Sequence, residues 1–270
     1  MANSDSYQDG VILRRWHGES LSEVASETKR QLPGGKLAVV AIEVKTSLYD
    51  NKHLAHTVEQ VIDSRWHLHH VWTETPVLGG LAFGDSGNNV CPELPSGVDL
   101  VFRFRHYDEL LLARTLEYTL DHNIFEVKES RIVTRALQLS YEGKFPLQDL
   151  LFVSGGVKGI EKQHRIIEQH FGGEFLEATC ISRGMVMERY VVLELCRAIE
   201  QLRVGYRTTV VTGVPYGVLI GHSKRIAKKS EIDILAFASP EVIRALANDR
   251  SVSGGFTVEK SPELEALIGL

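Results

Sequence analysis

The chain has 270 residues, of which 43% are hydrophobic, and this is enough for one large core or two modest ones. Its formal net charge of −5 argues against the strongly basic surface of a general nucleic-acid binder, although a local basic patch is compatible with it. The three cysteines are too few and too scattered for a disulfide framework or a zinc site. No apolar run reaches the length of a membrane span and the amino-terminal stretch is polar, so a cytoplasmic protein with no membrane partner is expected.

The apolar periodicity predicts strands and helices in alternation along the chain, without an internal repeat. Strands are expected at 11–13, 37–42, 76–83, 98–104, 124–127, 150–153, 206–211, 216–220 and 230–237. Helices are expected at 20–30, 53–66, 108–120, 160–171, 185–202 and 240–247, the first with Ser20 as its N-cap. This pattern predicts the α/β class, with a mixed β-sheet flanked by helices. We expect either two halves, 1–144 and 145–270, or one compact domain.

The most informative stretch is the apolar strand expected at 37–42, which continues into Glu43 and Lys45. Residues two apart on a strand point to the same face, so a carboxylate and an ammonium leave this strand side by side. Burying two charges is costly unless they are paired or bind something. In a metal-dependent phosphodiesterase the carboxylate holds Mg²⁺ and the lysine positions the attacking water. An ion pair at the surface end of a strand is the alternative interpretation.

A second acidic position, Asp233, lies inside the apolar strand expected at 230–237. A lone aspartate in such a strand is expensive to bury, so it needs a partner, and a divalent cation shared with Glu43 would serve. Glu194 is likewise an acid set among apolar residues of the helix expected at 185–202. An ordinary carboxylate on the face of a helix is the alternative there.

Together these motifs resemble the core of the PD-(D/E)xK nuclease superfamily, and most of all its NucC-type effector endonucleases. The resemblance covers residues 37–85 and 185–237. It implies a restriction-endonuclease-like core, a Mg²⁺ or Mn²⁺ cofactor, cleavage of nucleic acid, in particular DNA, and a homo-oligomer. It also implies that Glu43 and Asp233 bind the metal, that Lys45 assists the water, and that Glu194 supports the site from its helix.

The order of the motifs departs from that of the family. The family has the helix glutamate first, then the strand aspartate, then Glu-x-Lys, whereas here the Glu-x-Lys half comes first. One explanation is a circularly permuted core, which chain termini lying close together make feasible. The other is that Asp9, 34 residues before Glu43, is the metal-binding aspartate, in which case the helix that normally precedes it is missing.

Other acid–lysine pairs compete with the first. The candidate pairs, in our order of preference, are Glu43 with Lys45, Glu126 with Lys128, and Glu259 with Lys260. The second pair, combined with Asp99, repeats the spacing, but 124–125 is a weaker strand than 37–42. The last two residues are adjacent, so on a strand they would face opposite sides.

Three further motifs stay open. The basic run of Lys224, Arg225, Lys228 and Lys229 precedes Asp233 and is either a solvated loop or the place where a phosphate backbone docks. The glycine turn at 154–159 is either a tight turn or an anion-binding helix start, and the second would favour a non-catalytic, Rossmann-like nucleotide-binding sensor or interaction protein. The histidines at 67, 69 and 70 are expected to be exposed at a helix end.

Overall fold

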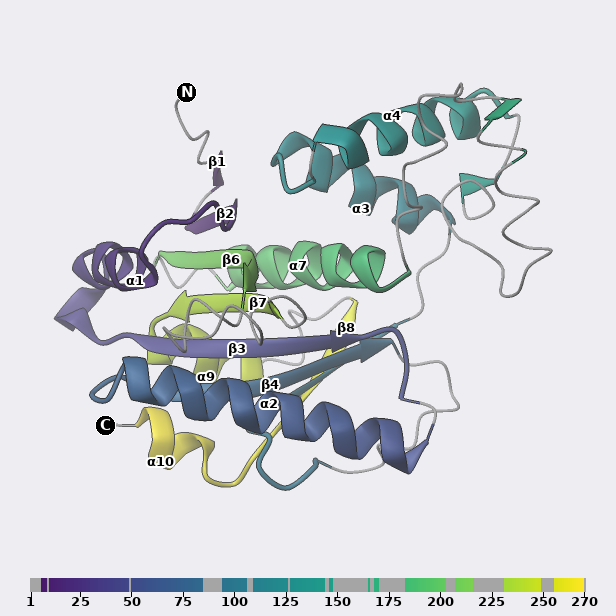
Figure 1. The fold of residues 1–270 in the computed structure, drawn as a ribbon. Coiled ribbons are helices and arrows are strands. Elements are labelled where there is room, and N and C mark those ends of the chain that lie inside the picture. Colours follow the sequence, from purple (N-terminus) through teal and green to yellow (C-terminus); the bar gives the residue numbers. More distant parts are fainter. Residues whose placement is uncertain are drawn as a thin grey trace. The chain divides into compact units, whose positions relative to one another are not determined.

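A computed structural model gives the fold of the chain (Figure 1). It describes residues 6–8, 10–48, 50–84, 94–105, 109–125, 127–143, 146–147, 165, 168–169, 183–202, 207–215, 231–248 and 255–269. These residues form two units, Met1–His106 with Glu194–Leu270, and Tyr107–Leu193. The boundaries at 106 and 193 differ from the division at 144 expected from the sequence.

The first unit is built on one mixed sheet of eight strands, which confirms the predicted α/β class. In sheet order the strands are β1 (Ser6–Gln8), β2 (Val11–Arg15), β6 (Thr208–Pro215), β7 (Glu231–Ala238), β3 (Ala38–Lys45), β4 (Val77–Gly84), β5 (Leu100–Phe104) and β8 (Phe256–Lys260). Parallel pairs are β2–β6, β3–β4 and β4–β5, and the other neighbours are antiparallel. Strands from both ends of the chain therefore meet at the centre, where β7 lies against β3.

Helices cover the sheet and make up the described part of the second unit. The first unit contains α1 (Leu21–Arg30), α2 (Asn51–Val71), α9 (Pro240–Asn248), α10 (Leu264–Ile268) and the 3₁₀ turn Pro33–Gly35. The second unit contains α3 (Glu109–Asp121) and α4 (Val127–Tyr141), and α7 (Arg183–Gln201) crosses the boundary between the units. None of the helices in the described part of the chain is long and apolar enough to cross a membrane.

Helix starts follow the capping residues in the sequence. Ser20 accepts a hydrogen bond from the Glu23 amide at 3.4 Å, so it is the N-cap of α1 as predicted. Asp50 caps α2 in the same way, through the His53 amide at 2.7 Å. The carboxylate satisfies one of the amides that a helix start leaves unpaired, which fixes the turn between β3 and α2.

Some predicted elements differ from those observed. The strand predicted at 124–127 is wrong, because Val127 already begins α4, a helix that the sequence analysis missed. The strand β8 was also missed, and α2 runs five residues beyond the predicted end at 66. The predicted strands at 150–153 and 216–220 and the predicted helix at 160–171 lie outside the described residues or almost wholly so.

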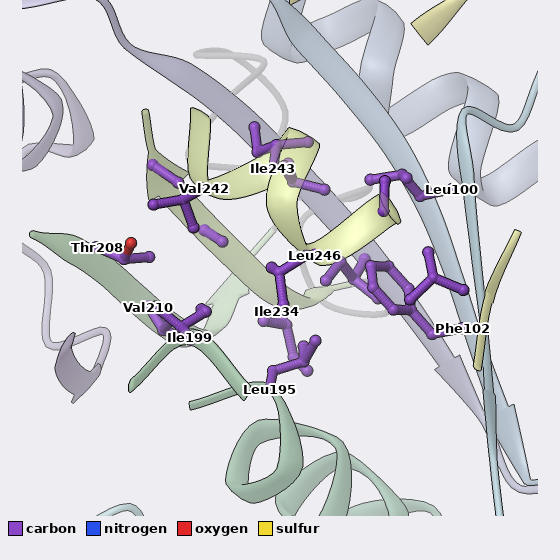
Figure 2. Close-up of a pocket in the computed structure, with 16 residues that line it drawn as sticks. Leu100, Phe102, Leu195, Ile199, Thr208, Val210, Ile234, Val242, Ile243 and Leu246 are labelled. Carbon is purple, nitrogen blue, oxygen red and sulfur yellow. The ribbon is translucent and has the colours of Figure 1, made fainter. Parts of the chain in front are cut away.

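The central strand β3 is buried on both faces, which is why its sequence is continuously apolar. Val39 and Ala41 pack on the side of α1 and α2, in one cluster with Val24 and Leu68. The alternate residues of β3 face α7 and α9 across an apolar cavity of about 30 Å³, shown in Figure 2. The described residues that line this cavity are aliphatic or aromatic, apart from Thr208, which has a hydroxyl group. This small space is a packing gap in the core, about the size of one water molecule.

Close packing of α2 on the sheet depends on Gly79. A Cβ atom at this position would lie 2.6 Å from Cγ1 of Val61 on α2. The absence of a side chain at Gly79 therefore permits the close approach of a helix of the same unit.

Candidate functional site

The pairing of β3 with β7 brings Asp233 next to the Glu43–Lys45 motif. The antiparallel register runs from Ala38 opposite Ala238 to Ile42 opposite Ile234. Just beyond the last of these pairs, Oδ2 of Asp233 accepts a hydrogen bond from the amide of Val44 at 2.7 Å. Val44 lies between Glu43 and Lys45, so two segments 189 positions apart in the sequence meet at one end of the sheet.

Glu43 and Lys45 form an ion pair at this end of β3. Nζ of Lys45 donates a hydrogen bond to Oε1 of Glu43, as expected for residues two apart on a strand. Glu43 is 8% exposed, and the Lys45 side chain is 22% exposed. The pair is therefore largely withdrawn from water, and an ion pair at this end of the strand is also what the alternative interpretation predicts.

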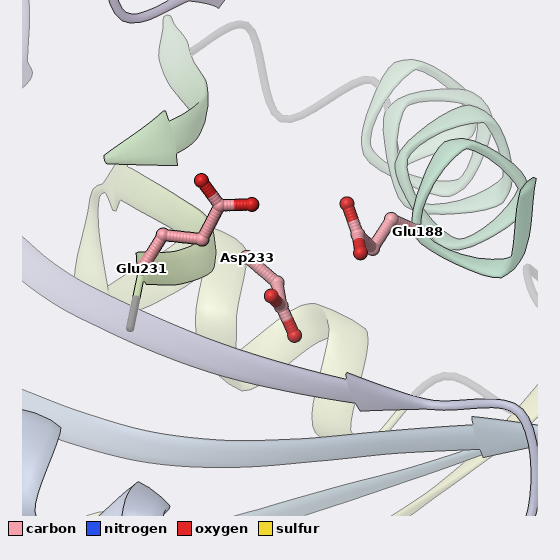
Figure 3. A group of neighbouring side chains, drawn as sticks. All are labelled: Glu188, Glu231 and Asp233. Atoms are coloured by element: carbon pink, nitrogen blue, oxygen red, sulfur yellow. The ribbon is translucent and has the colours of Figure 1, made fainter. Parts of the chain in front are cut away.

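A further acid lies beside Asp233. Glu231 precedes it by two residues on β7, and one carboxylate oxygen of each lies within 4.8 Å of the other (Figure 3). Asp233 is 9% exposed, whereas Glu231 is exposed. Carboxylates so close repel each other unless a proton or a cation lies between them. The sequence analysis missed Glu231, although the same spacing of two residues that links Glu43 to Lys45 also links Glu231 to Asp233.

Figure 3 also draws Glu188, which lies in the part of α7 that belongs to the second unit. The residues of the first unit that form the candidate site are Glu43, Lys45, Glu231 and Asp233. In the described part of that unit, Glu43 does not complete a group of three carboxylates with Glu231 and Asp233 at the 4.8 Å distance. The two strand ends are joined through the Val44 amide instead.

Glu194, the helix acid selected from the sequence, contacts a different set of residues. Its Oε1 lies 3.2 Å from Nη1 of Arg197, one turn further along α7. Its Oε2 lies against Gly255, where a Cβ atom would be only 2.3 Å away. Glu194 is thus held beside the start of β8, and Arg197 neutralises its charge.

Gly213 lies opposite Asp233 on the other neighbouring strand, β6. The β6–β7 register pairs Thr212 with Ile234 and Val214 with Ile232, and it leaves Gly213 beside Asp233. The φ of Gly213 is +67°, a left-handed conformation that only glycine adopts without strain. The ladder is therefore locally irregular on both sides of Asp233.

Asp99, a competitor for the metal-binding aspartate, has a structural role. It is 4% exposed, accepts the Gly79 amide at 2.8 Å and pairs with Nη1 of Arg65 at 3.2 Å. Burial raises the pKa of Asp99, although the Gly79 hydrogen bond and the Arg65 charge lower it in part and Glu263 adds to the rise. This carboxylate ties α2 and β4 to the start of β5.

Neither of the two competing acid–lysine pairs repeats the arrangement of Glu43 and Lys45 in the described part of the chain. Glu259 pairs with Arg103 at 2.8 Å, and Lys260 bonds Oδ1 of Asn248 at 2.6 Å, so on β8 the two side chains have different partners. Lys128 lies on a helix, α4, and not on a strand. Glu126 lies outside the described residues, as do Asp9, the basic run (Lys224, Arg225, Lys228 and Lys229) and the glycine turn at 154–159.

Comparisons with protein-family models, with curated proteins and with solved structures found no match to this chain.

Proposed function

We propose that this protein is a metal-dependent phosphodiesterase, a DNA endonuclease whose site lies at the facing ends of β3 and β7. The observation that carries the proposal is the hydrogen bond from the Val44 amide to Asp233, which joins the Glu43–Lys45 motif to the aspartate strand. Buried charges at a strand end are costly, and here two strands supply them at one place.

The order of neighbouring elements supports the resemblance to the PD-(D/E)xK core. In space, α7 leads into β6, β6 pairs with β7, β7 pairs with β3, and β3 leads through α2 to β4. Read across the sheet, this gives a helix, then the aspartate strand, then the Glu-x-Lys strand, which is the order of that family. The chain order is reversed because the Glu-x-Lys half comes first, as in a circular permutation. We therefore favour Asp233 over Asp9 as the metal-binding aspartate.

The donor atoms are of the type that a hard divalent cation prefers. Glu43, Asp233 and Glu231 offer carboxylate oxygens, the ligands that Mg²⁺ and Mn²⁺ prefer, against the single positive charge of Lys45. We assign metal binding to Asp233 and Glu43, with Glu231 as an additional ligand. A bound cation would polarise the phosphate and lower the pKa of its water. Lys45 would hold Glu43 in place through its ion pair and lie beside the charge that develops on the phosphate.

The DNA-binding and supporting residues follow from the resemblance and the sequence. The basic run before β7 (Lys224, Arg225, Lys228 and Lys229) is proposed to contact backbone phosphates, and the active form is proposed to be a homo-oligomer. Glu194 is proposed to support the site from α7, but its pairing with Arg197 weakens that assignment. A Glu194→Gln variant tests this assignment, and full activity in that variant would remove Glu194 from the site.

The test is nicking of a supercoiled plasmid by the purified full-length chain, with Mg²⁺, with Mn²⁺ and with a chelator. Lys45→Ala should lower the rate by about 100-fold or more, a loss typical of removing a catalytic group. Glu43→Gln and Asp233→Asn should do the same. Arg114→Ala, an exposed residue of α3, is the matched surface control and should keep the wild-type rate. Full metal-dependent activity in Lys45→Ala would reject the assignment.

Thermal melting separates metal binding from catalysis. A cation that binds only the folded protein raises the melting midpoint by mass action. Wild type and Lys45→Ala should both show this shift with Mn²⁺, because the lysine is not a ligand, whereas Asp233→Asn should lose it and Glu231→Gln should show a smaller one. A shift of wild-type size in Asp233→Asn would place the metal elsewhere.

A further inference from the structure

A groove of about 940 Å³ lies at the opposite end of the sheet from the proposed metal site. Its walls are the last turns of α1 and α2, the segments leading into β3 and β4, and α10. The charged and aromatic residues that line it are Lys29, Lys36, Arg65, Trp66, His69 and Glu74. Leu37, which directly precedes β3, lines this groove, and Glu43 is six residues further along the chain, a span of about 20 Å.

The aromatic wall of the groove is Trp66 of α2. Its side chain is among the most exposed of the large apolar residues, at 57%, and Ile62, one turn earlier and 42% exposed, extends the same wall. The indole ring is flanked by imidazoles, with centroids 4.0 Å from His70 and 4.7 Å from His67. Because α2 continues to Val71, these histidines are on a helix. The neighbours fix the position of an indole that still presents much of its surface to solvent.

The charged groups around the groove are mainly cationic. Lys29 and Lys36 are exposed, and Arg65 is half-buried with part of its charge used by Asp99. Glu74 is the acid among the described lining residues. Among the described lining residues the two exposed lysines, together with Arg65 shared with Asp99, outnumber the carboxylate of Glu74, whereas the whole chain has a net charge of −5. Its surface therefore suits a ligand that is both anionic and planar.

We propose that this groove binds single-stranded nucleic acid, with a base stacked on Trp66 and backbone phosphates held by Lys29 and Lys36. Aromatic side chains beside a cationic track are the combination with which proteins bind single strands without sequence preference. The two lysines come from neighbouring segments, the end of α1 and the lead into β3, so both can contact the phosphates of one strand. This binding site goes beyond the proposed function and does not depend on the metal-binding carboxylates.

The first test measures binding of a short fluorescein-labelled single-stranded DNA by fluorescence anisotropy, in a chelator so that no cleavage occurs. Wild type should bind, Trp66→Ala should weaken binding by about 10-fold or more, and Trp66→Phe should weaken it less because a phenyl ring still stacks. Lys29→Ala and Lys36→Ala should each reduce the slope of log K against log salt by about 0.7. Arg114→Ala, outside the groove, should change neither quantity.

Three results would overturn the proposal. These are wild-type affinity in Trp66→Ala with an unchanged circular dichroism spectrum, no binding by wild type at about 100 μM protein, and equal competition by a free mononucleotide or a duplex. Glu43→Gln separates this site from the proposed function: it should lose cleavage and keep strand binding. Cleavage that is absent while strand binding requires Trp66 would reject only the nuclease assignment.

Discussion

Asp99 and Asp233 are buried aspartates that each accept a hydrogen bond from the backbone of a neighbouring strand, but the charges around them differ. Asp99 bonds the Gly79 amide and pairs with the guanidinium of Arg65. Asp233 bonds the Val44 amide and has the carboxylate of Glu231 within 4.8 Å. The backbone bond is common to both positions, but at Asp233 it reaches the strand that carries Glu43 and Lys45. What differs is the charged group that lies beside each: a guanidinium at Asp99 and a second carboxylate at Asp233.

The difference has a direct consequence for the role of each residue. At Asp99 the protein itself supplies the compensating cation, and the carboxylate connects three secondary structure elements. At Asp233 the neighbouring carboxylate of Glu231 offers a second oxygen ligand, which favours an added cation. We therefore expect Asp99 to matter most for stability and Asp233 to matter most for metal binding. The predictions below test this division.

The largest expected effect on stability is that of Asp99→Ala. The substitution leaves the buried Gly79 amide without an acceptor and Arg65 without its partner, so the free energy of unfolding should fall by about 3 kcal/mol. Asp233→Ala should cost only about 1 kcal/mol, because losing the acceptor for Val44 is offset by relief of repulsion from Glu231. Urea unfolding of the two variants without metal measures both values. An equal or larger loss in Asp233→Ala would end the distinction between the two aspartates.

A smaller effect is expected at the glycine that donates to Asp99. Gly79→Ala would place Cβ 2.6 Å from Cγ1 of Val61, so α2 must move away from β4, at a cost of about 2 kcal/mol. Gly80→Ala is the matched control on the next residue, with its nearest contact 3.1 Å from Cγ1 of Ile42, and should cost about 1 kcal/mol or less. Thermal unfolding of the two variants measures the difference. Equal midpoints would show that α2 accommodates the added methyl group.

Much of the sheet could be predicted because its strands are short apolar runs bounded by breakers. The run from Leu37 to Ile42 is buried on both faces and has no polar alternation, which makes it recognisable without knowledge of its neighbours. The edge strand β8 was missed for the opposite reason: Phe256 alone of its five residues is buried. Such a strand forms because it pairs with β5, and its own sequence has too few apolar residues to indicate it.

The candidate site could be predicted only one strand at a time. The spacing of Glu43 and Lys45 predicted their ion pair correctly, because that contact is made within one strand. The position of Asp233 beside Val44 depends on β7 pairing with β3, a contact between the two ends of the chain that no local pattern specifies. The engagement of Glu194 with Arg197 and Gly255 depends in part on β8, which had not been recognised.

The smallest expected effect is a dependence of stability on pH at Asp99. Burial raises the pKa of this carboxyl in the folded protein above its ordinary value, so the folded state binds the proton more tightly than the unfolded state does. The resulting stabilisation is fully present below about pH 4, the unfolded value, and is lost as the pH rises through the folded pKa. Asp99→Asn cannot titrate but keeps an oxygen for the Gly79 amide, which makes it the reference. The free energy of unfolding of wild type relative to this variant should therefore fall between about pH 4 and the folded pKa and then level off. A difference that grows with pH would mean that Arg65 outweighs burial, and the two aspartates would then differ even more than proposed.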